Sequence, residues 1–218
     1  MAIPRISVLV SGRGSNLDAL LAAQRRERLG GTIATVISSR GAAPALGIAA
    51  AHGIATAVVE SRELGGGEAF DAALGAVIDA SEPDLVVLAG FMRILGPALV
   101  GHYEGRMLNI HPSLLPAYPG INTHQRALAD GVRIHGCTVH FVTAALDHGP
   151  IVAQGAVPVR DGDDEAALAA RVLAVEHRLL PAAVRAFCTG RLVIAGGRVH
   201  VDGECVPEAT LEVPSPAT

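Results

Sequence analysis

The chain has 218 residues, half of them apolar and 17% charged, with a formal net charge of −4. This composition is typical of a globular domain with a sizeable core, and it gives no basic footprint for a nucleic acid. With no run of 18 apolar residues and no charged-then-apolar leader, we expect a cytoplasmic protein without a membrane partner. The cysteines, Cys137, Cys188 and Cys205, are too widely spaced to indicate disulfides or a metal site.

The basic residues are all arginine, and the chain contains no lysine. A Schiff-base lysine, a pyridoxal enzyme of the usual kind and a Walker-A phosphate loop are therefore excluded.

Strand and helix patterns alternate along the chain. Short β-branched runs such as "RISVLVS" predict strands, and apolar residues at helical spacing, as in "NLDALLAAQRRERL", predict helices. In chain order we predict strand 5–11, helix 16–29, strand 32–39, helix 43–53, strand 55–60, helix 67–80, buried strand 84–91, strands 106–111, 136–142 and 151–159, and a long helix 163–188 bent near Pro181. A hairpin around Gly196 and Gly197 follows.

This alternation predicts an α/β fold, a doubly wound, mostly parallel sheet flanked by helices, which is Rossmann-like and ends in the long helix and hairpin. Ligands of such sheets bind outside the carboxyl ends of the strands. We assign residues 1–210 to a single domain and residues 211–218 to a disordered tail.

The segment "SGRGSN" at 11–16 follows the first predicted strand and opens the first predicted helix. Glycines let the backbone approach a ligand, and the N–H groups and dipole at a helix N-terminus favour an anion such as phosphate. Ser15 or Asn16 either caps the helix or bonds a phosphate oxygen. A tight turn without a ligand is the alternative.

The dinucleotide-binding fingerprint G-x-G-x-x-G fails here, because Leu17 stands where the third glycine belongs. Ser39 and Arg40, which end the second strand, suit the 2′-phosphate of NADP. An NADP-dependent oxidoreductase therefore stays as a second hypothesis.

The segment "LNIHPSLLPAYPG" at 108–120 puts an amide and an imidazole at the end of a strand. Residues two apart on a strand point the same way, so Asn109 and His111 share a face at the ligand-binding edge. Together they could hold a developing oxyanion, and the imidazole could move a proton. The alternative is a polar strand end bonded only to neighbouring backbone.

The segment "TAALDHGP" at 143–150 carries Asp147 in a loop between strands. An aspartate beside His111 would favour the protonated imidazole and fix its tautomer. A turn-forming role is the alternative. We expect His148 to be solvated and His140 to be structural, and since no cluster has metal-ligand spacing, we expect no metal.

A resemblance rests on segments that appear in a specific order over most of the chain. They are "SGRGSNLDALL", "VVLAGFMRIL", "LNIHPSLLPAYPGINTHQRAL", "GCTVHFVTAALDHGPIVAQ" and "RVLAVEHRLLP". Together they resemble the phosphoribosylglycinamide formyltransferase family, folate-dependent enzymes of purine biosynthesis. The resemblance covers residues 5 to 200, and the long central segment is its most specific part.

The resemblance implies a reaction between two small molecules. A formyl group moves from 10-formyltetrahydrofolate, the co-substrate, to the glycinamide amine of 5-phosphoribosylglycinamide through a tetrahedral intermediate, without a metal. The N-terminal half would bind the ribonucleotide phosphate, and the C-terminal half would bind folate and hold the catalytic residues. The enzyme would be a monomer or a homodimer.

The resemblance also assigns roles to single residues. Asn109 and His111 would contact the formyl oxygen, with His111 as proton donor, and Asp147 would keep His111 protonated and help to relay the proton of the attacking amine through water. The ribonucleotide would be held by Gly14, Ser15, Asn16 and Glu176. The folate would lie along Met92, Arg93, Ile94 and Leu95, beside Asn109, with Thr143, Ala144 and Asp147 on its other side.

Two positions depart from the family pattern. Gly67 stands where many relatives carry an arginine that is thought to meet the folate tail, so Arg62 or another arginine would have to replace that contact. Asn122 stands where some relatives have histidine.

Other formyl-folate enzymes share the Asn, His and Asp pattern. Formyltetrahydrofolate hydrolase usually adds an N-terminal regulatory domain, and methionyl-tRNA formyltransferase a nucleic-acid-binding C-terminal domain, for which this chain has no room. A non-catalytic nucleotide-binding module would need no such set of residues. The ribonucleotide transferase is therefore the preferred hypothesis.

Overall fold

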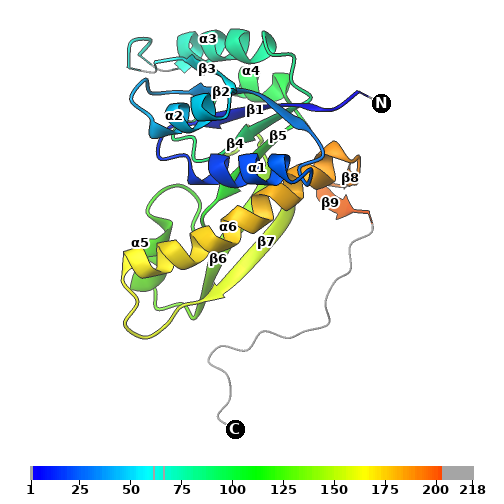
Figure 1. Cartoon of the computed structure of the whole chain (residues 1–218). Coiled ribbons are helices and arrows are strands. Elements are labelled where there is room, and N and C mark those ends of the chain that lie inside the picture. Colours follow the sequence, from blue (N-terminus) through cyan, green and yellow to red (C-terminus); the bar gives the residue numbers. More distant parts are fainter. Residues whose placement is uncertain (1, 61, 66, 203–218) are drawn as a thin grey trace.

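A seven-stranded sheet in the order β3-β2-β1-β4-β5-β6-β7 forms the centre of the computed structural model, which describes residues 2–60, 62–65 and 67–202 (Figure 1). The strands from β3 to β5 run parallel, whereas β6 is antiparallel to β5 and β7 to β6. The predicted doubly wound, mostly parallel sheet is confirmed. The predicted tail 211–218 and Cys205 lie outside the described residues.

The strands are β1 (Arg5–Val10), β2 (Thr32–Ser38), β3 (Ala55–Val58), β4 (Leu85–Leu88), β5 (Met107–His111), β6 (Ile134–Phe141), β7 (Ile151–Pro158), and the hairpin strands β8 (Leu192–Ala195) and β9 (Arg198–Val201). The helices are α1 (Ser15–Arg25), α2 (Pro44–Ala51), α3 (Gly67–Asp79), α4 (Pro97–His102), α5 (Thr123–Ala129) and α6 (Glu165–Cys188).

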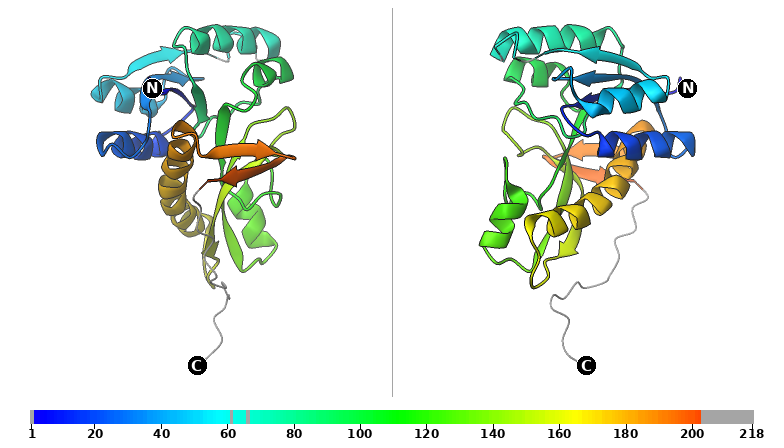
Figure 2. Two further views of the ribbon diagram at one scale, coloured as in Figure 1. Left: turned by 90° about the vertical axis from the view of Figure 1, so that its right-hand side faces the viewer. Right: turned by 60° about the vertical axis from the view of Figure 1, so that its left-hand side comes forward.

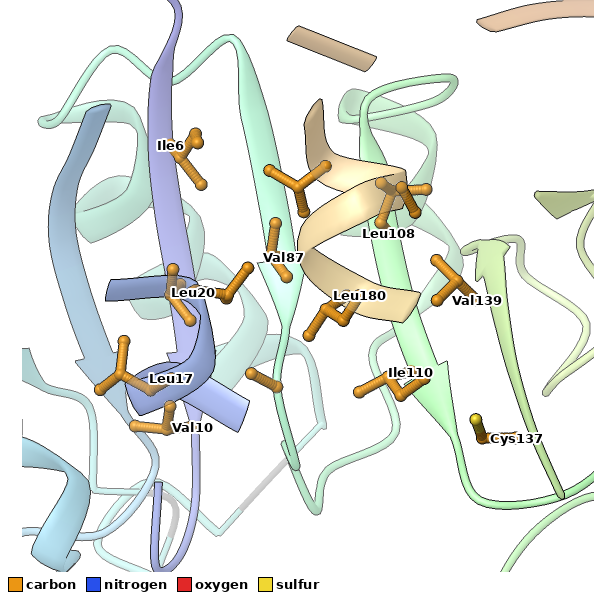
Figure 3. Close-up of a cluster of buried hydrophobic side chains, with 14 of the residues drawn as sticks. Ile6, Val10, Leu17, Leu20, Val87, Leu108, Ile110, Cys137, Val139 and Leu180 are labelled. Carbon is orange, nitrogen blue, oxygen red and sulfur yellow. The ribbon is translucent and has the colours of Figure 1, made fainter. Parts of the chain in front are cut away.

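Helices cover both faces of the sheet. Buried side chains of α1, α2, α5 and α6 belong to one apolar cluster, and those of α3 and α4 belong to a second. Helices α1 and α6 lie side by side across the first face (Figures 1 and 2). Figure 3 shows Leu17 and Leu20 of α1 and Leu180 of α6 among strand residues of this core. One continuous core therefore joins the first and last parts of the chain.

The alternation of side chains along β5 places the predicted site. Leu108 and Ile110 enter the core beneath α6, whereas Met107 packs with the cluster of α3 and α4. Asn109 and His111 point to the same side as Met107, because successive strand residues face opposite ways. Helices α3 and α4 pack on that side against the earlier strands, which leaves the end of β5 facing a cavity.

Helix α1 ends at Arg25 and not at Leu29 as predicted. Glu27 has a φ of 56°, and the N–H groups of Glu27 and Arg28 bond back to the last turn, so the helix closes there. The charged run after Ala23 has no apolar spacing that would hold a further turn on the sheet. The predicted long helix is confirmed as α6, with Pro181 inside it.

Candidate active site

A cavity of about 650 Å³ opens at the carboxyl ends of β4 and β5. Its walls come from the segment after β4, the end of β5, the segment before α5 and the loop after β6. The predicted folate and catalytic residues that line it are Met92, Arg93, Ile94, Leu95, Asn109, His111, Thr143, Ala144 and Asp147. The structure thus brings together residues that are far apart in sequence, at the edge of the sheet where the fold predicts a ligand.

The two ring nitrogens of His111 have different partners, a backbone carbonyl for Nε2 and a carboxylate for Nδ1. Its Nε2 lies 2.9 Å from the carbonyl oxygen of Tyr118, and because a carbonyl only accepts, Nε2 carries the hydrogen. Its Nδ1 lies 3.5 Å from Oδ2 of Asp147, and both side chains are almost fully buried. A carboxylate facing Nδ1 can exchange a hydrogen with that nitrogen, so the arrangement suits proton transfer at Nδ1.

Asp147 is held by the backbone around it. Its Oδ2 accepts the N–H of Gly120 at 2.8 Å, and its own φ is 54°, a conformation that aspartate tolerates better than most residues. Two residues later, a Cβ at Gly149 would overlap the carbonyl of Phe141. Only glycine lets the loop return so close to β6, and this close return places the carboxylate beside the imidazole.

Asn109 and His140 form a second polar contact in the site, next to that of His111 and Asp147. Nδ2 of Asn109 lies 3.2 Å from Nε2 of His140, whose Nδ1 lies 2.9 Å from the carbonyl oxygen of Phe141. Burial lowers the pKa of the His140 imidazole, with the Phe141 carbonyl and Asp147 acting against it. Neutral His140 therefore donates from Nδ1 and accepts from the Asn109 amide, which keeps its second N–H for a ligand.

His140 was expected to be structural, but the structure places it in the site. It lines the cavity, and its Nε2 is 3.8 Å from Oδ1 of Asp147. A position directly across from Asn109 in the β5–β6 pair explains this contact. The pairing register, which the sequence does not reveal, was the missing signal.

A pair of histidines, His124 and His135, lies near this site, and the sequence did not predict it. Nδ1 of His124, at the cavity wall, is 3.2 Å from Nε2 of His135 on β6. Burial is the main cause that lowers the pKa of His135 to about 4; the neighbouring His124 acts in the same direction, and the backbone of Pro112 opposes them. His135 therefore stays neutral at pH values well below the ordinary pKa of a histidine.

The predicted phosphate loop has the backbone that an anion site needs. Gly14 precedes α1 with a φ of 85°, and a Cβ there would come within 2.8 Å of Cβ of Ala45, so glycine is required. The first N–H groups of a helix have no partner within it, and among the residues that the structure describes no side chain caps α1. The alternative that Ser15 or Asn16 caps this helix is therefore wrong.

Asn16 instead reaches across to α6. Its Nδ2 donates to Oε2 of Glu176 at 2.7 Å, and both residues are 7% exposed. Burial raises the pKa of the Glu176 carboxyl, and the bond from Asn16 opposes this rise. Oδ1 of Asn16 is buried without a hydrogen-bond partner among the described residues, which is the expected state of a group that meets a ligand.

The predicted phosphate loop and the cavity are neighbours. The N–H of Met92, at the cavity, donates to Oγ of Ser11 at 2.8 Å, and Ser11 bonds Oγ of Ser39 at 2.7 Å. Ser39 is buried in this contact and is therefore not free for a 2′-phosphate. Of the two residues that were expected to suit the 2′-phosphate of NADP, only Arg40 remains free to do so, which weakens the oxidoreductase hypothesis.

The described part of the chain shows no group of three or more His, Cys, Asp or Glu side chains placed to hold a metal ion. Within the same residues, no helix is both long enough and apolar enough to span a membrane.

Comparison with known proteins identifies the class. The sequence pattern of the formyl transferase family matches residues 4–184, so the chain belongs to the formyl transferase family. It is 47% identical over 202 residues to the phosphoribosylglycinamide formyltransferase of Escherichia coli (strain K12), covering 93% of this chain and 95% of that protein.

Solved structures agree with this assignment. The fold matches glycinamide ribonucleotide transformylase 1 from Symbiobacterium toebii with a TM-score of 0.89 and 47% identity, over 91% of this chain and 94% of that one. A formyltetrahydrofolate deformylase from Pseudomonas syringae pv. tomato is also similar, with a TM-score of 0.85 and 29% identity. This chain covers 66% of the deformylase.

Proposed function

We propose that the protein is a phosphoribosylglycinamide formyltransferase of purine biosynthesis. It transfers the formyl group of 10-formyltetrahydrofolate to the glycinamide amine of 5-phosphoribosylglycinamide and releases tetrahydrofolate. The observation that carries this proposal is the convergence of Asn109, His111 and Asp147 on a cavity next to the N-terminus of α1, which has no side-chain cap among the described residues. The 47% identity to the E. coli enzyme over nearly all of both chains supports the choice of substrates.

The amide of Asn109 and Nδ1 of His111 stabilise the oxyanion. When the amine attacks, the formyl oxygen becomes negatively charged, and preorganised donors in a buried site stabilise this charge strongly. Asn109 has a free N–H once its bond to His140 is made, and Nδ1 of His111, which faces Asp147 at 3.5 Å, is the ring nitrogen that is not bonded to the backbone. Both donors come from one face of β5, so their spacing is set by the strand.

His111 and Asp147 move the protons. The attacking amine must lose a proton, and the folate nitrogen must gain one before it leaves. Nδ1 of His111 donates to the departing nitrogen, and the Asp147 carboxylate beside it accepts the amine proton through water. The Gly120 N–H keeps the carboxylate in place during these transfers.

The ribonucleotide binds across α1 and α6. Its phosphate accepts hydrogen bonds from the N–H groups around Gly14 and Ser15, and its glycinamide part contacts Asn16 and Glu176. Because Met92 is bonded to Ser11 at the start of the same loop, this position directs the amine toward the cavity.

The folate occupies the cavity, with its ring system between the 92–95 segment and the 143–147 loop. The cavity fits this use, because Ile94 and Leu146 expose apolar surface there while Thr143 and the backbone offer polar groups. Arg93 lines the cavity and is exposed. Arg93 is therefore the candidate partner for the acidic tail of the folate, because Gly67 stands where many relatives carry an arginine.

We also propose that the enzyme is metal-free and cytoplasmic, and is a monomer or a homodimer. Analytical ultracentrifugation distinguishes the two assemblies, and an unchanged rate after dialysis against a chelator tests the independence from metal.

An absorbance assay with 10-formyltetrahydrofolate, with and without the ribonucleotide, tests the reaction. We expect tetrahydrofolate only when the ribonucleotide is present. Product without it would identify a hydrolase, the activity of the similar Pseudomonas protein. No product in either mixture, together with binding of NADPH, would support the oxidoreductase.

A further inference from the structure

One buried hydroxyl ties down the loop that follows His111. Thr138 on β6 is fully buried and is the partner of His111 in the β5–β6 pair. Its Oγ1 donates to the carbonyl of Ser113 at 2.7 Å and accepts the N–H of Leu115 at 3.0 Å. Two points of the loop 112–118 are therefore fixed to the sheet by one oxygen atom.

Gln154 on β7 completes this contact. Its Nε2 donates to the carbonyl of Leu115 at 2.9 Å and to Oγ1 of Thr138 at 3.0 Å. A hydroxyl has one donor and two acceptor positions, and an amide nitrogen has two donors. All of these positions are used, and a fully satisfied network around the buried Thr138 hydroxyl specifies a single arrangement.

The loop ends at the group that sets the tautomer of His111. Inside it, Oγ of Ser113 donates to the carbonyl of Ala117 at 2.6 Å, and the carbonyl of Tyr118 then meets Nε2 of His111 at 2.9 Å. A displaced Tyr118 carbonyl would release Nε2, and the hydrogen would no longer be confined to that nitrogen. The network therefore controls the ring from a distance.

We infer that Thr138 and Gln154 are positioning residues, which hold the Tyr118 carbonyl against Nε2 of His111 so that Nδ1 faces Asp147 and the substrates. Neither side chain lines the cavity, so both act through His111. The effect on turnover rests on the proposed function. The effect on the histidine tautomer does not, because it is measured on the protein without substrates.

The test compares Thr138→Val, which keeps the shape and removes the hydroxyl, with Thr138→Ser, which keeps the hydroxyl. We expect Thr138→Val to lower kcat about 10- to 100-fold with both KM values within about 2-fold, because misplacement by an ångström costs this much. Thr138→Ser should restore kcat to within about 3-fold. In ¹⁵N NMR spectra, the Nε2–H signature of His111 should weaken in the valine variant and return in the serine variant.

Gln154→Met is the second variant, because Gln154 is exposed on β7 and its loss spares the core even where Thr138→Val prevents folding. We expect Gln154→Met also to lower kcat and to weaken the Nε2–H signature of His111, each by less than Thr138→Val does. A folded Thr138→Val or Gln154→Met protein with wild-type kcat and an unchanged His111 signature would overturn the inference. If the wild type shows no formyl transfer, the proposed function fails, and the tautomer comparison alone decides the positioning role.

Discussion

His111 illustrates how the backbone selects the chemistry of a side chain. A carbonyl seven residues later holds Nε2, and a carboxylate from another loop faces Nδ1. The imidazole thus has a defined tautomer and one nitrogen that can exchange a proton with a ligand. Asn109, on the same face of β5, adds a neutral donor.

Loss of the proton-handling groups should affect turnover much more than binding. We expect His111→Ala and Asp147→Asn each to lower kcat by about 10²- to 10⁴-fold, since general acid–base groups contribute this much. Binding of the ribonucleotide, measured by calorimetry, should stay within about 3-fold, because the proposed site of its phosphate is at α1, away from both substitutions. An equal loss of binding and turnover in both variants would contradict this division of roles.

Asn16 should matter to one substrate only. We expect Asn16→Ala to raise the KM for the ribonucleotide about 10-fold or more, because a hydrogen bond to the buried Glu176 carboxyl is lost. The KM for the folate should not change. Ser15→Ala is the matched control, since its backbone N–H remains. A folate KM that rises as much as the ribonucleotide KM would be evidence against separate sites.

Part of this site follows from the period of two in a strand. That period, with a fold that binds ligands at strand ends, is enough to pair Asn109 with His111. The Tyr118 carbonyl, the Gly120 N–H and the buried network of Thr138 could not be predicted. They are contacts between backbone and distant side chains, and no local pattern in the sequence encodes the register that creates them.

At the scale of elements, the strands and the longer helices were predictable, and the two shortest helices were not. Helices α4 and α5 have six and seven residues and were missed. Each follows a loop, and neither is long enough to show helical periodicity. Helix α5 begins after Asn122 at a φ of 56°, and α4 begins at Pro97. These are start signals that loops share.

Helix α6 has the side-chain cap that α1 lacks. Oδ1 of Asp164 accepts the N–H of Ala167 at 2.7 Å. We expect Asp164→Ala to lower the free energy of unfolding by about 1 kcal/mol, as for other N-caps. Thermal unfolding should then occur about 2–4 °C lower for a chain of this size.

Asp161→Ala is the control for the cap, because its carboxylate is exposed in an ion pair with Arg133. We expect that variant to change the free energy of unfolding by less than about 0.5 kcal/mol. Equal destabilisation by the two substitutions would mean that the cap contributes nothing specific.

At the scale of the whole molecule, the two halves share one core and one site. Apolar residues of α1, the sheet and α6 form a single cluster, and Asn16 bonds Glu176 across 160 positions of sequence. This supports the proposal of a single domain.

Buried His135 should make the folded state sensitive to acid. Its folded pKa of about 4 lies below the ordinary value, so between these two pH values the unfolded chain binds a proton that the folded chain does not. Stability therefore falls as the pH falls from about 6.5 toward 4, by up to about 1.4 kcal/mol per pH unit for this group.

Urea unfolding at several pH values measures this dependence. A His135→Asn variant should lose less stability on acidification than the wild type, whereas a substitution of the exposed His200 should follow the wild type. Identical pH slopes for the wild type and the His135 variant would show that this histidine titrates normally.

The most direct measurement is a crystal structure of the protein with glycinamide ribonucleotide and a stable 10-formyl folate analogue. Our account predicts the formyl oxygen within hydrogen-bond distance of the Asn109 amide and Nδ1 of His111, and the phosphate at the N-terminus of α1. A folate outside the cavity, or a phosphate in the arginine-lined groove between α1 and α6 (which Arg26, Arg178 and Arg185 border), would contradict it.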